Sequence, residues 1–317
     1  VVMDVTNFFL ADNPLFPPFS PYAPITGNGQ RTITKMFKKD KSQFAKVKAF
    51  EDNASLQTML TYEVDVRDKQ QYYMYKLPFS TVMTYSFILL PEEQMRPRIA
   101  DPRIGIFYQG VSDFRNGDSG LKNIYYAQRW RLEPSDETAF RMGQLVEPKK
   151  PIVFYVDRKT PSRWVPYFIE AVNAWQKAFE RIGFKNAIRG ELAPTPEENP
   201  DFSEYDTRYS FISWKASPVR NAYGPSTVDP RSGEIMTSHV GIFSSVWDLV
   251  QQWYFAQCGA NDKLARETVM PDSLLGEIVK MVVSHEIGHT LGLEHNFIGS
   301  SLYSVEQLRD NAFLDKH

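Results

Sequence analysis

The stretch that decides the fold is HEIGHTLGLEH, at residues 285–295. In a helix, His285 and His289 are four positions apart and therefore lie one turn apart on the same face. Gly292 can adopt the left-handed backbone conformation that ends a helix. A reversal of the chain at this glycine would bring His295 back towards the other two histidines. The spacing therefore predicts three imidazoles that share one volume.

Three histidines in this arrangement match the chemistry of a catalytic zinc site. Catalytic zinc uses three protein ligands and keeps one position open, whereas structural zinc is normally closed by four ligands. We therefore predict that Zn²⁺ is held by His285, His289 and His295. Glu286 follows the first of these histidines and is predicted to act as general base on water at the metal without binding the metal itself.

The residues before this stretch alternate between strand and helix signals. Leu275, Val279, Val283, Ile287 and Leu291 form an apolar row at helical spacing behind the histidines, which predicts a helix from about residue 272 to 291. Thr160 and Pro161 read as the N-cap and first position of a long helix that Gly183 ends. The pattern predicts strands at 152–156, 209–214 and 234–243, a long helix at 161–182, and a further helix at 244–257. This predicts a mixed sheet packed on a long helix and the histidine-bearing helix.

The first half of the chain has a different period. From about residue 54 to 132 apolar and polar residues alternate, as half-buried strands require, with strands expected at 60–67, 72–76, 81–90, 104–108 and 124–131. Residues 11–30 are rich in proline and are expected to be irregular. The proline-lysine segment at 147–151 marks the change of period. We predict an α+β protein with an antiparallel β-rich domain at 1–148 and a catalytic domain at 149–317.

Composition limits the other classes of function. The net charge of −2 gives no reason to expect nucleic acid as a partner. No apolar run approaches the length of a membrane span, and no signal peptide is present in the sequence. The single cysteine, Cys258, excludes an internal disulfide framework and a cysteine-based zinc site.

The motif HExxHxxGxxH resembles that of the metzincin clan of metallopeptidases. This resemblance implies the same roles for the three histidines and Glu286, and a zincin-like upper subdomain from residue 149 onwards. The wider chain is similar to large bacterial zinc-dependent metalloproteases that carry an uncharacterised β-rich region before the catalytic domain. Metzincins have a methionine turn after the third histidine, but the last methionine here is Met281. We therefore expect a catalytic domain that is cut short, and the resemblance implies a secreted, periplasmic or surface-anchored protein.

The predicted activity is that of a zinc-dependent endopeptidase, with a protein or peptide substrate bound in extended form along an edge strand. Three alternatives are open. A downstream carboxylate, Glu294 or Glu306, would replace the third histidine in a glutamate-type zincin. The second alternative is a catalytically incompetent zinc-bearing module that binds protein or glycan. In the third, the β-rich half defines the function, as a binding domain or a steric inhibitor.

Overall fold

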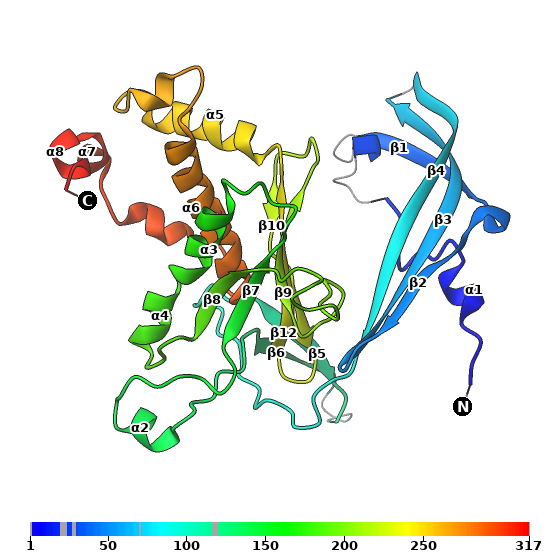
Figure 1. Ribbon diagram of the computed structural model, residues 1–317, viewed down its shortest axis with the longest axis horizontal. Coiled ribbons are helices and arrows are strands. Elements are labelled where there is room, and N and C mark those ends of the chain that lie inside the picture. Colours follow the sequence, from blue (N-terminus) through cyan, green and yellow to red (C-terminus); the bar gives the residue numbers. More distant parts are fainter. Residues whose placement is uncertain (1, 20–23, 27–29, 70, 116–119, 317) are drawn as a thin grey trace. The chain divides into compact units, whose positions relative to one another are not determined.

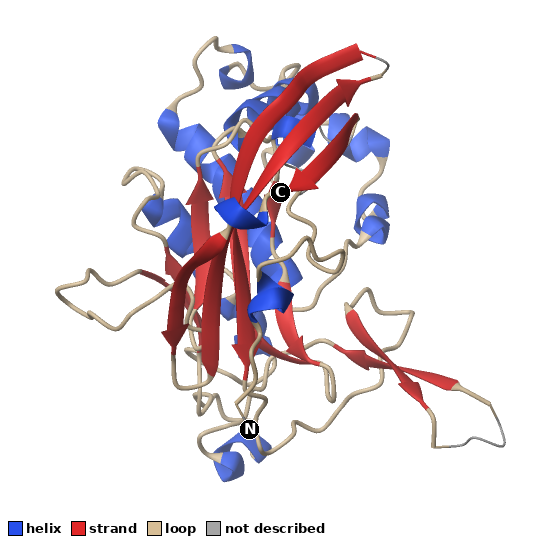
Figure 2. Cartoon of the chain, turned by 90° about the vertical axis from the view of Figure 1, so that its right-hand side faces the viewer, coloured by secondary structure: helices blue, strands red, loops and turns tan. Residues whose placement is uncertain are grey.

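The chain forms two compact units in the computed structural model. The structure describes residues 2–19, 24–26, 30–69, 71–115 and 120–316. The first unit comprises Val1–Leu90 and Asp201–Arg208, and the second comprises Pro91–Pro200 and Tyr209–His317. The long helices belong to the second unit, whereas the first is built from long strands (Figure 1 and Figure 2). Within the described residues, no helix is both long enough and apolar enough to cross a membrane.

The first unit is an antiparallel sheet, as predicted. The long strand β3 pairs with the three others and supplies a buried core of Leu60, Tyr62, Val64 and Val66. The strands are β1 Arg31–Phe37, β2 Gln43–Ala49, β3 Asn53–Asp68 and β4 Gln71–Ile88. The sequence predicted two strands where β4 runs unbroken, because Pro78 is tolerated on this outer strand.

Short helical turns accompany this sheet. They are α1 Thr6–Phe9, η1 Pro24–Thr26 and η2 Lys39–Lys41. Residues 11–19 contain no helix or strand, in agreement with the irregular start predicted for 11–30, while 20–23 and 27–29 lie outside the described residues. The distant segment Asp201–Arg208 joins the unit through Asn53, whose side chain donates to the carbonyl of Tyr205 (2.9 Å) and accepts from the amide of Thr207 (3.1 Å).

The second unit is organised around a mixed sheet, which confirms the predicted α+β class. Its strands follow the order β10-β12-β9-β7-β8, and β11 also pairs with β12. The central pairs β7–β8, β7–β9 and β9–β12 are parallel, whereas β10 and β11 run antiparallel to β12. The bounds are β7 Ile152–Val156, β8 Ile188–Leu192, β9 Ser210–Lys215, β10 Ala222–Tyr223, β11 Ser226–Asp229 and β12 Glu234–Phe243. β10 and β11 therefore form one edge of this sheet, and β8 forms the other.

Helices α3 and α6 pack against the sheet and against each other (Figure 1). Phe154 of β7, Phe168 and Val172 of α3, and Val279 and Val283 of α6 are fully buried in the shared core. The helices are α3 Val165–Asn173, α4 Gln176–Arg181, α5 Val246–Cys258 and α6 Asp272–Thr290, and the turn η4 Leu264–Arg266 precedes α6.

The prediction of one continuous helix at 161–182 is wrong in two respects. Residues 161–164 form a turn in which the amide of Trp164 donates to the carbonyl of Pro161, so the helix begins at Val165. The helix is also interrupted at Ala174 and Trp175. At the break, the indole Nε1 of Trp175 donates to the carbonyl of Ser284 on α6 (3.0 Å). The interruption thus ties this helix to the one that carries the histidines.

Residues 91–148 pack with the second sheet. They contain the hairpin of β5 Tyr108–Asp113 and β6 Lys122–Ala127, and the helix α2 Glu137–Arg141. The amide of Arg129 donates to the carbonyl of Gly233, and Val146 pairs with Phe184. The two compact units therefore divide at residue 90, and the domain boundary at 148/149 stays a prediction. After α6 the chain forms η5 Phe297–Ser301, α7 Val305–Arg309 and α8 Asn311–Leu314.

Candidate metal centre

Helix α6 orients the first two histidines. Its apolar row of Leu275, Val279, Val283 and Ile287 is buried against the sheet and α3. This burial fixes the rotation of the helix, because an amphipathic helix is held mainly by its packed apolar face. His285 and His289 lie on the other side, where they line a cavity. The predicted helix and its buried row are both confirmed.

The helix ends in a Schellman motif centred on Gly292. The amide of Leu293 donates to the carbonyl of Gly288 (3.1 Å), and the amide of Gly292 donates to that of His289 (2.9 Å). Gly292 has a φ of +97°, and a Cβ there would lie 2.3 Å from the carbonyl oxygen of Gln128. Only glycine satisfies both the backbone conformation and this close approach. The predicted reversal of the chain is therefore present.

The reversal brings the three histidines together. The Nε2 atoms of His285 and His295 are 3.2 Å apart, and one ring nitrogen from each of the three histidines lies within 4.8 Å of the others. Two nitrogens bound to one tetrahedral zinc at about 2.0–2.1 Å lie about 3.3 Å apart. The three-imidazole set therefore fits a single zinc ion, although the roles of the residues as ligands stay a prediction.

The orientation of His289 is fixed by a backbone carbonyl. Its Nδ1 lies 2.8 Å from the carbonyl oxygen of Leu293, which can only accept, so Nδ1 carries the proton and donates. The other nitrogen, Nε2, is then left with a free lone pair. A hydrogen bond of this kind commonly fixes the tautomer of a metal-binding histidine.

Burial shifts the pKa of two residues in the cluster. Burial lowers the pKa of His285, and the neighbouring His289 and His295 lower it further, so its neutral, metal-binding form is favoured. Burial raises the pKa of Glu286, an effect that His289 opposes. The carboxyl of Glu286 makes no hydrogen bond or ion pair with the described residues. Its negative charge is therefore costly to keep in the folded protein.

The histidines open into a cavity of about 660 Å³. Helices α5 and α6 contribute aliphatic and aromatic side chains to its lining. The histidine cluster with Glu286, and the edge of the sheet, complete it. The lining residues are Phe107, Asn221, Ala222, Tyr223, Gly224, Pro225, Val246, Leu249, Trp253, Met281, Val282, His285, Glu286, His289 and His295.

Gly224 brings the edge of the sheet directly against α6. A Cβ at this position would lie 2.6 Å from the carbonyl oxygen of Glu286 and 3.2 Å from the Cγ2 of Thr290. Its backbone amide and carbonyl make no hydrogen bond within the part of the chain that the structure describes. The backbone between β10 and β11 therefore offers free hydrogen-bonding groups beside the histidine cluster.

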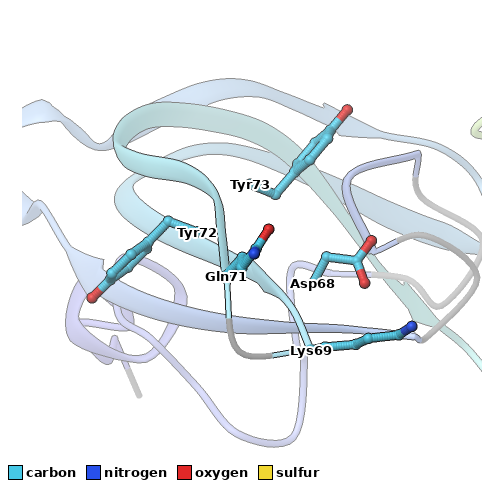
Figure 3. Close-up of a pocket in the computed structure, with 5 residues that line it drawn as sticks. All are labelled: Asp68, Lys69, Gln71, Tyr72 and Tyr73. Carbon is cyan, nitrogen blue, oxygen red and sulfur yellow. The ribbon is translucent and has the colours of Figure 1, made fainter.

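A second cavity, of about 710 Å³, lies at the turn between β3 and β4 in the first unit. It is lined by Asp68, Lys69, Gln71, Tyr72 and Tyr73. Tyr72 and Tyr73 point in opposite directions, as neighbouring residues of a strand do (Figure 3). They therefore form no continuous aromatic surface. Among the described residues, the possible metal-binding group is the cluster of His285, His289 and His295.

The structure separates the predicted site residues from the alternatives. His285, His289 and His295 are brought together with Glu286 adjacent, whereas neither Glu294 nor Glu306 belongs to a possible metal-binding group among the described residues. Sequence reasoning missed Phe107, whose ring centroid lies 5.6 Å from that of His289. It also missed the carbonyl of Leu293 and the close approach at Gly224. Phe107 and Gly224 reach the site from distant segments, for which the sequence carries no periodic signal. The Leu293 carbonyl reaches His289 only because the chain turns at Gly292.

Comparison with known families agrees with this geometry. Residues 267–317, which include α6 and all three histidines, match the Met-zincin family. The chain carries a Met-zincin domain. Residues 1–135 match a domain of unknown function, DUF5117. No curated protein and no solved structure matches the chain.

The Met-zincin match lies within the second compact unit, and the DUF5117 match extends into it from the first. The DUF5117 region ends at residue 135, beyond Phe107 and the β5–β6 hairpin. The sheet edge and α5, which complete the cavity, lie between the two matched regions. The Met-zincin motif thus supplies the histidines, while other parts of the chain supply their surroundings.

Two effects make glycine necessary at position 292, the positive φ and the close approach of Gln128, and their contributions to stability can be measured separately. Gly143 also has a positive φ, +77°, but a Cβ there meets nothing within 4 Å. We expect Gly143→Ala to lower the free energy of unfolding by about 1–2 kcal/mol. Gly292→Ala should cost roughly 1–3 kcal/mol more, because the methyl group overlaps the Gln128 carbonyl. Urea unfolding of both variants measures the difference, and equal losses would contradict the role assigned to the contact.

The buried charge of Glu286 predicts a pH-dependent gain in stability on its removal. The folded-state pKa of Glu286 is raised above its ordinary value of 4.5, so the folded protein loses stability as pH rises from that value through the raised pKa. In the metal-free protein we expect Glu286→Gln to be more stable than the parent at neutral pH and equally stable below the ordinary pKa.

Urea unfolding across a pH series tests this expectation. Glu294→Gln is the matched control, because Glu294 directly precedes His295 of the same cluster but has an exposed side chain. A Glu286→Gln variant whose stability follows the parent at every pH would show that the Glu286 carboxylate is not penalised by burial.

Proposed function

We propose that the protein is a zinc-dependent endopeptidase. The single observation that carries the proposal is the convergence of three imidazoles beside a buried carboxyl at the wall of a cavity. Membership of the Met-zincin family supports it. His285, His289 and His295 would hold the metal. When bound there, zinc activates water at about neutral pH and polarises the scissile carbonyl.

Glu286 would act as the general base and then as the general acid. Its carboxylate takes the proton from the attacking water, holds it, and delivers it to the nitrogen of the leaving amine. The raised pKa of Glu286 suits this role, since a group that must both accept and release a proton works best when its pKa lies near the working pH.

The substrate would bind in extended form along the edge of the sheet. The free amide and carbonyl of Gly224 support this arrangement, because an extended peptide pairs with exposed backbone groups of an edge strand. The apolar side of the cavity, formed by Leu249, Trp253 and Met281, would receive an apolar side chain next to the scissile bond. The preferred substrate would therefore be a protein segment that can extend and that carries an apolar residue at this point.

A zinc-bearing binding module without turnover is the competing function. Such a module gains nothing from an unpaired buried carboxylate, because its desolvation only lowers stability. The position of Glu286 therefore favours the enzyme.

Two substitutions separate metal binding from turnover. Glu286→Gln should retain zinc and reduce peptide hydrolysis by a factor of at least about 10²–10⁴, since the amide cannot accept the proton of water. His289→Ala should lose both zinc and hydrolysis. Bound zinc is measured by elemental analysis, and hydrolysis with a fluorogenic peptide library, each with and without chelator.

Glu294→Gln is the control for these substitutions and also tests the alternative third ligand. It should retain both zinc and activity. Hydrolysis that survives chelation and the Glu286→Gln change would refute the proposed mechanism. A parent protein that binds zinc yet cleaves no member of the library would favour the binding module.

A further inference from the structure

The segment Gly105–Phe107 pairs with the turn that carries the third histidine. The amide of Phe107 donates to the carbonyl of Gly292 (2.7 Å), and the amide of Glu294 donates to the carbonyl of Gly105 (3.0 Å). Ile106 and Leu293 form the antiparallel bridge between these bonds. The segment lies inside the region matched by DUF5117, whereas the turn lies inside the Met-zincin region. Two separately recognised families thus meet at one backbone pairing.

This pairing acts on His289 in two ways. It fixes Leu293, whose carbonyl accepts the hydrogen bond from Nδ1 of His289. It also places the ring of Phe107 against the imidazole of His289, with 5.6 Å between the centroids and 56° between the ring planes. A histidine ring held by a hydrogen bond at one nitrogen and by an aromatic face has little freedom to rotate. The direction of the remaining nitrogen, Nε2, is therefore set by the segment.

Residues 128–130 contact both this segment and the end of α6. The amide of Gln128 donates to the carbonyl of Phe107 (2.8 Å). The carbonyl oxygen of Gln128 lies so close to Gly292 that a Cβ there would be 2.3 Å from it. Two residues further along, the indole of Trp130 donates to the carbonyl of Thr290, at the end of α6 (2.9 Å). Residues on both sides of the β5–β6 hairpin thus brace the end of the helix and the turn after it.

We propose that Phe107 is a positioning residue for the metal centre, and that residues 105–107 hold His289 and the turn to His295 in their metal-binding arrangement. The proposal rests on the function proposed above, because it assumes that His289 binds zinc. It assigns a role to part of the DUF5117 region, because residues 105–107 of that region complete the site of the Met-zincin domain. Phe107 also lines the cavity into which the histidines open.

The test compares two neighbouring aromatic residues. Phe107→Ala removes the ring that faces His289 but leaves the backbone pairing. Tyr108→Ala removes an adjacent ring that is 53% exposed and packs on Tyr125 instead. Residues that orient a ligand histidine typically contribute about 10–100-fold to metal affinity. We expect Phe107→Ala to weaken zinc binding by that factor, measured by competition with a chromophoric chelator, and Tyr108→Ala to leave it unchanged.

A second readout distinguishes positioning from general stability. In the metal-free protein, nitrogen-15 NMR of the imidazoles, recorded well above the ordinary histidine pKa of about 6.5, reports the tautomer of each ring. We expect His289 of the parent and of Tyr108→Ala to be protonated at Nδ1 only. Phe107→Ala should show a mixture of tautomers. Phe107→Leu, which restores an apolar contact but no ring, should lie between Phe107→Ala and the parent in both the tautomer and the zinc affinity.

The outcomes are separable. Equal zinc affinity and an unchanged His289 tautomer in Phe107→Ala would overturn this proposal while leaving the proposed function intact. A parent that binds no zinc would overturn both. If Phe107→Ala does not fold, Phe107→Leu and Tyr108→Ala decide the matter, because a Leu variant with the parent's tautomer and affinity, in which no ring faces His289, would show that the ring is not needed.

Discussion

The reversal of the chain at Gly292 is the constraint on which the metal centre depends. A helix alone can present His285 and His289 on one face, but no continuation of it would return His295 to within 3.2 Å of His285. The left-handed residue makes the turn possible, and the Schellman hydrogen bonds use the carbonyls that the helix end leaves unpaired. The same glycine lets the Gln128 backbone approach to a distance that any side chain would block. One residue therefore joins the ligand geometry to the packing around it.

Stability and reactivity are opposed at Glu286. The carboxyl sits beside the histidines, and its burial raises its pKa and makes its charged form costly. No described residue forms a hydrogen bond or an ion pair with it. A folded protein normally pairs or neutralises such a group. The same helix buries Val279, Val283 and Ile287 completely, and this apolar burial offsets the cost. The helix can therefore carry an unfavourable buried charge because its apolar residues are so well packed.

Sequence reasoning recovered the parts of the structure that are encoded locally. The apolar row of α6, the strands β7 and β12, and the turn at Gly292 each follow from a period or a residue preference within a short window. It failed where contacts between distant segments decide where a helix or strand begins and ends. The helix predicted for 161–182 is broken at Trp175, whose indole reaches a carbonyl of α6. The strand predicted at 104–108 begins only at Tyr108, because the residues before it pair with the turn at Gly292 instead of continuing the hairpin.

The same distinction applies within the site. The residues with predicted chemistry lie within eleven consecutive positions, so a motif can find them. Their surroundings come from Phe107, Gln128, Trp130, Trp175 and Gly224, which are spread over more than a hundred residues and share no spacing. Each contacts the site through a hydrogen bond to a backbone carbonyl, a close backbone approach or an aromatic ring. None of these contacts requires a particular residue next to it in the sequence, so no motif marks them. A family boundary drawn on sequence similarity can therefore fall through the middle of a functional site, as it does here between the DUF5117 region and the Met-zincin domain. The unit proposed to bind metal is defined by what holds the histidines in place, and that unit begins well before the motif.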